Sequence, residues 1–515
     1  MGKNAASKLL FQSSDWSFKT LSHAYDAIET IALDELGLDV YPNQLEIISS
    51  EQMLDAYSSV GMPLMYQHWS FGKRFVFEEH GYRKGHHGLA YELVINSNPC
   101  ITYLMEENTM AMQTLVTAHA AFGHNHFFKN NYLFRQWTDA GAILSYMEFA
   151  KKYITKCEER HGTSAVEVIL DSAHALMDQG VFRYRRPPRL SSKKEQERAR
   201  ERLEYEEQTY SDLWRTLPRA TGRPDPEEAE RDALERKKVL NLPEENLLYF
   251  LEKNSLILEP WQRELLRIVR VIAQYFYPQR QTKVMNEGCA TFVHYTIINR
   301  LFDQGKISEG AMLEMLHSHS SVVFQPHFDD PRFSGLNPYA LGLSLMQEIE
   351  RICNHPTSED RDWFPQIAGS GQWRETLLDA WANHRDESFI LQYLSPHLIR
   401  KFRLFLLTDQ ADEKYCEVAS IHNERGYEAI RKALARSYDV GANQQDIQVV
   451  DVDLLGDRRL RLQHNIKNGI LLEEGNRDAT LRHIRHLWGY DVSLAGIDAE
   501  TGDVRYECST TQLGG

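Results

Sequence analysis

The chain has 515 residues, and at roughly 150 residues per domain it should form two to four domains. It carries 58 Lys and Arg against 73 Asp and Glu, a formal charge of −15, so general nucleic-acid binding through phosphate neutralisation is not expected. The 42% share of hydrophobic residues is typical of a globular chain with a core, and no apolar run is long enough to predict a membrane span. The first residues lack an apolar signal segment and the six cysteines are scattered singly, which predicts a cytoplasmic protein.

The N-terminal part of the chain is predicted to be mostly helical. The Gly-, Pro- and His-rich stretch 61–90 predicts irregular structure, and the alternation over 91–104, broken at Asn98-Pro99, predicts one or two strands. Apolar residues at helical spacing predict helices over 17–36, 50–57, 108–127, 137–159 and 164–178.

A charged insertion interrupts this helical region. Residues 183–238 are almost bare of apolar side chains, so they are predicted to be a solvated insertion of charged helix and loop. Helical spacing resumes over 242–255, 259–277, 284–305, 337–354 and 372–394.

The pattern changes after Arg400, where short β-like runs alternate with helical patterns at 426–438 and 476–489. The sequence therefore predicts a mainly α-helical (α+β) protein. Its expected domains are a helical one over 1–399, containing the insertion, and a small α+β domain over 400–515.

Two predicted helices carry residues that suit a metal site. His119 and His124 lie in one apolar helix, and Glu287 and His294 lie in another. Imidazole nitrogens and carboxylate oxygens are ligands for a divalent ion such as zinc, so His/Glu pairs on neighbouring buried helices are what such a site requires. Glu287 and His294 are seven residues apart and should share a helix face. The alternative is that these are hydrogen-bonded core histidines.

The spacing within the first helix is less regular. His119 and His124 are five residues apart, which places them about 140° apart around a regular α-helix. A π-bulge, for which Gly123 is a suitable seat, would bring five-spaced residues closer together. His126 shares a face with His119 on a regular helix and is a further candidate.

A third helix carries Asp171 and His174 at a three-residue spacing, which places both on one face. Such pairs occur in the di-metal sites of helical bundles. His174 is therefore predicted to be a further ligand, with Asp171 orienting it.

A second group of histidines lies in the irregular stretch. His68, Lys73, His86 and His87 are predicted to line a polar pocket and contact substrate, the alternative being a surface loop with incidental histidines. A weaker site role is assigned to His317, His319 and His327. No phosphate-binding glycine motif is present, so no nucleotide cofactor is expected.

Several long blocks resemble the stage V sporulation protein R (SpoVR) family. They are YQHWSFGK (66–73), YELVINSNPC (91–100), AHAAFGHNHFFKNNYLF (118–134), MNEGCATFVHY (285–295) and NPYALG (337–342). The family pattern AHxxxGHxxFF maps onto His119 and His124 rather than His126, and NEGxAxxxH maps onto Glu287 and His294.

The resemblance implies a cytoplasmic stress or sporulation-type module linked to the cell envelope. It implies as partners a PrkA-type serine kinase and a YeaH/YhbH-type protein, and it suggests a cell-wall peptide as substrate. It does not supply an established reaction.

Three functions are compatible with these residues. The first is a metal-dependent hydrolase of amide or peptide bonds, with zinc held by His119, His124, His294 and His174 and with Glu287 as a ligand or as the general base. The second is a non-enzymatic adaptor of the kinase module, in which the histidine core is structural. The third is a di-metal redox protein containing iron or manganese.

Overall fold

The computed structural model describes most of the chain, and all structural statements below concern the described residues. These are 9–58, 65–70, 73, 92–183, 200, 238–408, 417–420, 422–453, 456–467 and 469–511. The predicted insertion 183–238 and the predicted irregular stretch 61–90 lie mostly outside them.

The chain forms two compact units, and each combines two separate stretches of sequence. Unit 1 contains Met1–Lys151 and Pro278–Asp439, and unit 2 contains Lys152–Tyr277 and Val440–Gly515. The units are not divided at residue 400, where the sequence analysis placed the domain boundary. Residues 400–439 group with the N-terminal helices, and 152–277 group with the C-terminal strands.

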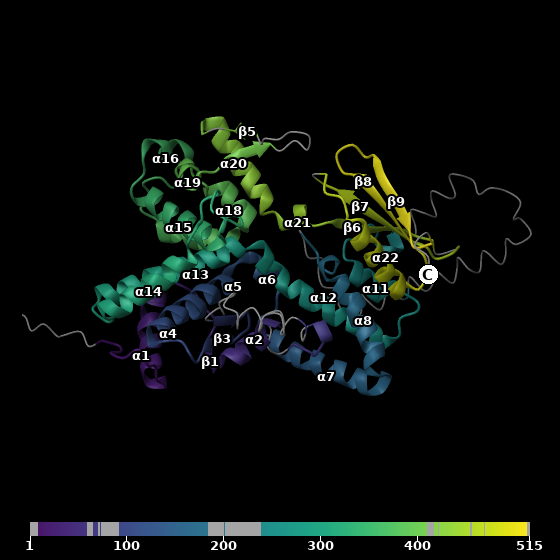
Figure 1. Ribbon diagram of the computed structural model, residues 1–515, viewed down its shortest axis with the longest axis horizontal. Helices are drawn as coiled ribbons and strands as arrows, with labels where there is room; N and C mark the ends of the chain where they lie inside the picture. The colour runs from purple at the N-terminus through teal and green to yellow at the C-terminus, as the bar shows by residue number, and fades with distance from the viewer. Residues whose placement is uncertain are drawn as a thin grey trace, which may run out of the picture. The chain divides into compact units, whose positions relative to one another are not determined.

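Helices make up most of unit 1 (Figure 1). Polar side chains define several of their starts: Ser17 forms a capping box at α1, and Asn337 caps α15 one residue before Pro338. The helices and π-helical segments assigned to unit 1 are α1 (Phe18–Thr30), η1 (Ile31–Glu35), α2 (Ser50–Ser58), α4 (Met110–Thr117), η2 (Ala118–His124), α5 (Asn125–Asn130), α6 (Tyr132–Trp137), α13 (Lys283–Asp303), α14 (Glu309–Val322), α15 (Pro338–Asn354), α16 (Ser358–Trp363), α17 (Trp373–Asn383), α18 (Asp386–Tyr393), α19 (Pro396–Lys401) and α20 (Glu424–Ser437). Helix α7 (Ile143–His161) is divided between the two units at Lys151.

Two small sheets belong to unit 1. In the first, β3 (Cys100–Met105) lies between β1 (Asn43–Ile48), which is parallel to it, and β2 (Glu92–Ile95), which is antiparallel. The break predicted at Asn98-Pro99 is the turn between β2 and β3, whereas β1 was not predicted. The second sheet pairs β4 (Leu406–Thr408) with β5 (Glu417–Ser420).

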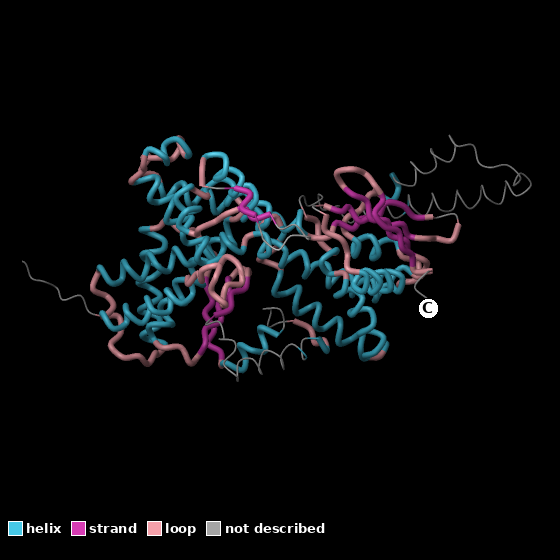
Figure 2. The backbone as a smooth tube through the Cα atoms, turned by 45° about the horizontal axis from the view of Figure 1, so that its top comes forward, coloured by secondary structure: helices cyan, strands magenta, loops and turns pink. Residues whose placement is uncertain are grey.

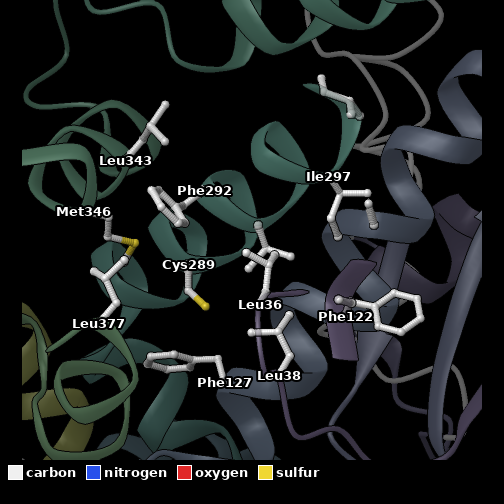
Figure 3. Packing of buried hydrophobic residues seen from close by; sticks show 14 of the residues in the cluster. Leu36, Leu38, Phe122, Phe127, Cys289, Phe292, Ile297, Leu343, Met346 and Leu377 are labelled. Atoms are coloured by element: carbon white, nitrogen blue, oxygen red, sulfur yellow. The ribbon is translucent and has the colours of Figure 1, made fainter. Parts of the chain in front are cut away.

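The core of unit 1 forms where α13 packs against α15 and η2. Figure 3 shows Cys289 and Phe292 of α13 among side chains from these and neighbouring elements. Three glycines permit this close packing: a Cβ on Gly123 would lie 2.5 Å from the Cα of Ala290, and one on Gly288 would lie 2.6 Å from the Cα of Gly342. The backbones of the three elements therefore approach more closely than any side chain would allow.

Unit 2 contains a four-stranded sheet in the order β6-β7-β8-β9. The central pair β7–β8 is parallel and both outer pairs are antiparallel. On β7, buried and more exposed residues alternate, as expected for a sheet with one covered face. The elements are α8 (Thr163–Ala175), η3 (Met177–Gln179), α11 (Leu247–Asn254), α12 (Pro260–Gln281, mostly in this unit), α21 (Val440–Asn443), β6 (Asp446–Val452), β7 (Leu460–Ile466), α22 (Glu474–Trp488), β8 (Val492–Asp498) and β9 (Val504–Ser509).

The predicted fold class is confirmed, since helices dominate and the strands form small sheets (Figure 2). Strands β8 and β9 and helix α14 were not predicted. None of the helices in the described part of the chain has both the length and the apolar character that a bilayer span requires.

Candidate metal centre

The π-helical segment η2 brings His119 and His124 together. Their ring centroids lie 4.7 Å apart in an edge-to-face arrangement. In a π-helix the hydrogen bonds run between residues five apart, so the five-residue spacing places both imidazoles on one side. The segment thus has the π-helical geometry that the sequence analysis considered for this spacing, and Gly123 lies within it where it meets Ala290 of α13.

Helix α13 supplies Glu287 to the same site. Its first turn is held by Asp386, whose carboxylate accepts hydrogen bonds from the amides of Val284 and Met285, both at 2.9 Å. Burial raises the pKa of Asp386 to about 7. Because Gly288 follows Glu287 at the contact with Gly342, the carboxylate is carried on a segment with little freedom to shift.

A second carboxylate, Glu92, reaches the site from strand β2. Its Oε1 atom lies 3.6 Å from Nε2 of His119. Burial and, to a smaller extent, the Glu287 carboxylate raise the pKa of Glu92 to about 8. The sequence analysis missed this residue, although a glutamate in an otherwise apolar strand, inside one of the quoted family blocks, was an available signal.

The four side chains direct their ligand atoms toward one another. Oε2 of Glu287 lies 3.6 Å from Nε2 of His124 and 3.9 Å from Nε2 of His119. Ligand atoms of Glu92, His119 and His124 all lie within 4.8 Å of one another. Tetrahedral zinc with ligands at about 2.1 Å has ligand atoms about 3.4 Å apart, so these side chains would have to move closer together to hold such an ion.

The outer sides of the two imidazoles are also hydrogen-bonded. Nδ1 of His124 lies 2.9 Å from Oδ1 of Asn286, and Nδ1 of His119 lies 2.8 Å from Nδ1 of His294. Nε2 of His294 lies 2.9 Å from Nδ1 of His319 on α14. Burial lowers the pKa values of His119 and His294 well below the usual range and lowers that of His319 as well.

The structure thus brings together three of the predicted site residues, His119, His124 and Glu287. The predicted ligand His294 lies on the far side of His119 from the glutamates, with hydrogen bonds at both ring nitrogens. His319, to which only a weaker role had been assigned, is its partner. His126 faces elsewhere: its Nδ1 lies 3.0 Å from both the amide nitrogen and the carbonyl oxygen of Asp39.

The remaining predicted site residues are not tested by this cluster. His174 and Asp171 lie on α8 in unit 2, so their membership of the same site stays a prediction. In the irregular stretch, His68 is buried with Nδ1 2.7 Å from the Ser70 hydroxyl, and Lys73 is exposed. His86 and His87 lie outside the described residues.

The centre combines two imidazoles and two carboxylates. His119 and His124 are 6% and 9% exposed, and Glu92 and Glu287 are 18% and 19% exposed, so the imidazoles are buried and the carboxylates are nearer solvent. Two imidazoles and one carboxylate form the ligand set of many catalytic zinc sites, and the same set also binds iron(II). A second carboxylate beside such a set is a group that can accept a proton.

Comparisons with known proteins agree with the blocks quoted above. The family described as "SpoVR like protein" matches residues 15–443, and the family described as "SpoVR-like C-terminal domain" matches residues 445–499. The chain therefore belongs to the SpoVR family.

One relative is similar over nearly its whole length. The "Uncharacterized protein YcgB" of Escherichia coli (strain K12) is 54% identical over 485 residues, which cover 94% of this chain and 93% of the relative. No solved structure matches the chain.

Proposed function

We propose that the protein is a metal-dependent hydrolase of amide or peptide bonds, with zinc as its metal. His119, His124 and Glu92 would hold the ion, and Glu287 would act as the general base toward a water molecule at the metal. A three-ligand zinc site leaves a position for that water and lowers its pKa toward neutrality.

The observation that carries this proposal is a convergence of acceptor atoms. Oδ1 of Asn286 can only accept a hydrogen bond, so His124 must donate from Nδ1, and its neutral ring then presents an unprotonated Nε2. This atom lies 3.6 Å from Oε2 of Glu287, a buried oxygen that accepts no hydrogen bond from any described residue. Facing acceptors with no donor between them are unfavourable unless a proton or a cation lies among them.

The same arrangement supports hydrolysis. The two carboxylates are 18% and 19% exposed, so the centre is less deeply buried on their side than at the imidazoles. A carboxylate near a metal-bound water can take its proton and return it to the leaving amine. His68, Lys73, His86 and His87 remain the predicted source of substrate contacts.

The envelope link of the family supports a cell-wall peptide as the first substrate to test. The same proposal includes a cytoplasmic location. It also includes two partners, a PrkA-type kinase and a YeaH/YhbH-type protein. The name of the E. coli relative supplies no activity that could be carried over.

Elemental analysis of protein purified without a metal-affinity step tests the metal. We expect about one zinc per chain in the wild type and none in His119→Ala. His317→Ala, which removes an exposed histidine of α14, should keep its zinc. Hydrolysis of peptide and amide substrates is then compared between the wild type and Glu287→Gln.

Other metal contents would contradict the proposal. Two equivalents of iron or manganese would favour the redox alternative. A folded wild type without stoichiometric metal would favour the adaptor.

A further inference from the structure

Three imidazoles form a hydrogen-bonded row behind the metal centre. His119 contacts His294 through their Nδ1 atoms at 2.8 Å, and Nε2 of His294 contacts Nδ1 of His319 at 2.9 Å. All three side chains are buried. The row crosses three elements, since His119 lies in η2, His294 in α13 and His319 in α14.

Each contact in this row requires one proton, and each neutral imidazole carries one N–H. With neutral rings only two arrangements satisfy both contacts. In the first, His119 donates from Nδ1 to His294, and His294 donates from Nε2 to His319. In the second, both bonds run in the opposite direction and His119 carries its proton on Nε2.

Only the first arrangement leaves Nε2 of His119 free to bind a cation. In the second, an N–H would point toward Oε1 of Glu92 at 3.6 Å and Oε2 of Glu287 at 3.9 Å. The neighbouring ligand His124 needs no such row, because the carbonyl oxygen of Asn286 fixes its tautomer directly. The His119 ring also has a hydrogen bond with the backbone of Ala290. The row of imidazoles acts beside that contact, and its far end is the ring of His319.

We propose that His319 is a positioning residue of the metal centre: by accepting the proton of His294 at Nδ1, it holds His119 in the tautomer that binds the ion. The inference rests on the proposed function, since it concerns the same centre. A partner that fixes the tautomer of a ligating histidine typically contributes roughly 10- to 100-fold to metal affinity.

Two variants separate this role from packing, because His319 also stacks on Tyr295 with ring centroids 4.8 Å apart. His319→Asn keeps an acceptor oxygen near the position of Nδ1 and loses the ring. His319→Phe keeps a ring for the stack and loses the acceptor. His317→Ala, on the exposed face of the same helix, is the matched control.

Zinc affinity of the full-length chain is measured by competition with a chromogenic chelator. We expect the Phe variant to bind zinc roughly 10- to 100-fold more weakly, with the Asn variant and the control within about threefold of the wild type. In the zinc-bound wild type, ¹⁵N spectra of labelled histidine should show His119 protonated at Nδ1 and His294 at Nε2.

Several results would overturn the inference. Full affinity in the Phe variant, or weak binding in both folded variants, would show that the acceptor is not what matters. The opposite tautomers in the zinc-bound spectrum would do so as well. A wild type that binds no zinc would instead overturn the proposed centre itself, so the two failures are distinguishable.

Discussion

Nδ1 of His124 donates a hydrogen bond to Oδ1 of Asn286 at 2.9 Å. Asn286 is the residue that directly precedes Glu287 on α13. One turn of α13 therefore acts on both sides of the same imidazole. Asn286 fixes the proton on the outer nitrogen, and Glu287 faces the inner one at 3.6 Å. This pairing explains why adjacent polar residues occupy an otherwise apolar helix face.

Asn286→Ala should weaken metal binding without removing a ligand. Without this acceptor, neither the tautomer nor the orientation of the His124 ring is fixed. We therefore expect roughly a 10- to 100-fold lower zinc affinity. Chelator competition measures the effect. Asn299→Ala on the same helix, where the side-chain amide donates to the Tyr295 carbonyl, should bind zinc normally. Equal affinity in the two variants would contradict the role of Asn286.

The two carboxylates should respond differently to neutral replacement. Glu92→Gln removes a charged ligand and should reduce zinc content, whereas Glu287→Gln should retain zinc and lose hydrolysis by roughly 100-fold or more, as expected for a general base. Elemental analysis and a peptide-hydrolysis assay on the same preparations check both expectations. If only Glu287→Gln lost its zinc, Glu287 would be the ligand and Glu92 the general base.

Bound metal should stabilise the folded chain by mass action. Free zinc at 100 times its Kd contributes about 2.7 kcal/mol to the free energy of unfolding if the unfolded chain does not bind it. We therefore expect the Tm of the wild type to rise on adding zinc and to fall with a chelator. His119→Ala should show neither shift, and an equal shift in that variant would indicate binding elsewhere.

The contact between α13 and α15 depends on the absence of side chains. A Cβ on Gly342 would meet the backbone of Val284 and Gly288, neither of which can move aside alone. Gly342→Ala should lower the free energy of unfolding by about 1–3 kcal/mol or more and should also disturb metal binding. Chemical denaturation of the variant and the wild type measures this loss in the free energy of unfolding.

Gly310→Ala in α14 is the matched control for Gly342→Ala. A Cβ there meets nothing closer than the Ser308 hydroxyl at 4.0 Å, so we expect no loss and a gain of up to about 1 kcal/mol. A comparable loss in both variants would argue against the packing explanation.

Glu244 should make stability depend on pH, independently of the metal centre. Burial raises its pKa from 4.5 to about 7. The folded state thus holds a proton that the unfolded chain releases above pH 4.5, so stability falls as pH rises from about 4.5 to 7 and is then level. The full effect is on the order of 3 kcal/mol.

Glu244→Gln removes this contribution and keeps an acceptor for the Asn246 amide, which bonds Glu244 Oε1 at 2.9 Å. The variant should therefore be more stable than the wild type at pH 8 and similar near pH 4.5. Urea denaturation at both pH values measures the difference. A constant difference across pH would show that Glu244 is ionised in the folded state.

Local sequence patterns determined much of the helical architecture. Apolar spacing predicted α1, α4, α8, α11, α12, α13 and α15, because a helix that buries one face must repeat apolar residues near every 3.6 positions. The five-residue spacing of His119 and His124 made a π-bulge worth considering, since a widened turn brings such residues to one side, and η2 has this geometry. Strand β1 and helix α14 carried weaker periodicity and were not predicted.

The membership of the centre was decided by tertiary structure. His119, His124 and Glu287 were predictable because each lies on a helix whose periodicity is evident in the sequence. Glu92 and His319 join them from a strand and a helix that are remote in sequence. Their proximity arises from the packing of α13 against its neighbours through Gly123, Gly288 and Gly342, a long-range contact that no local pattern encodes.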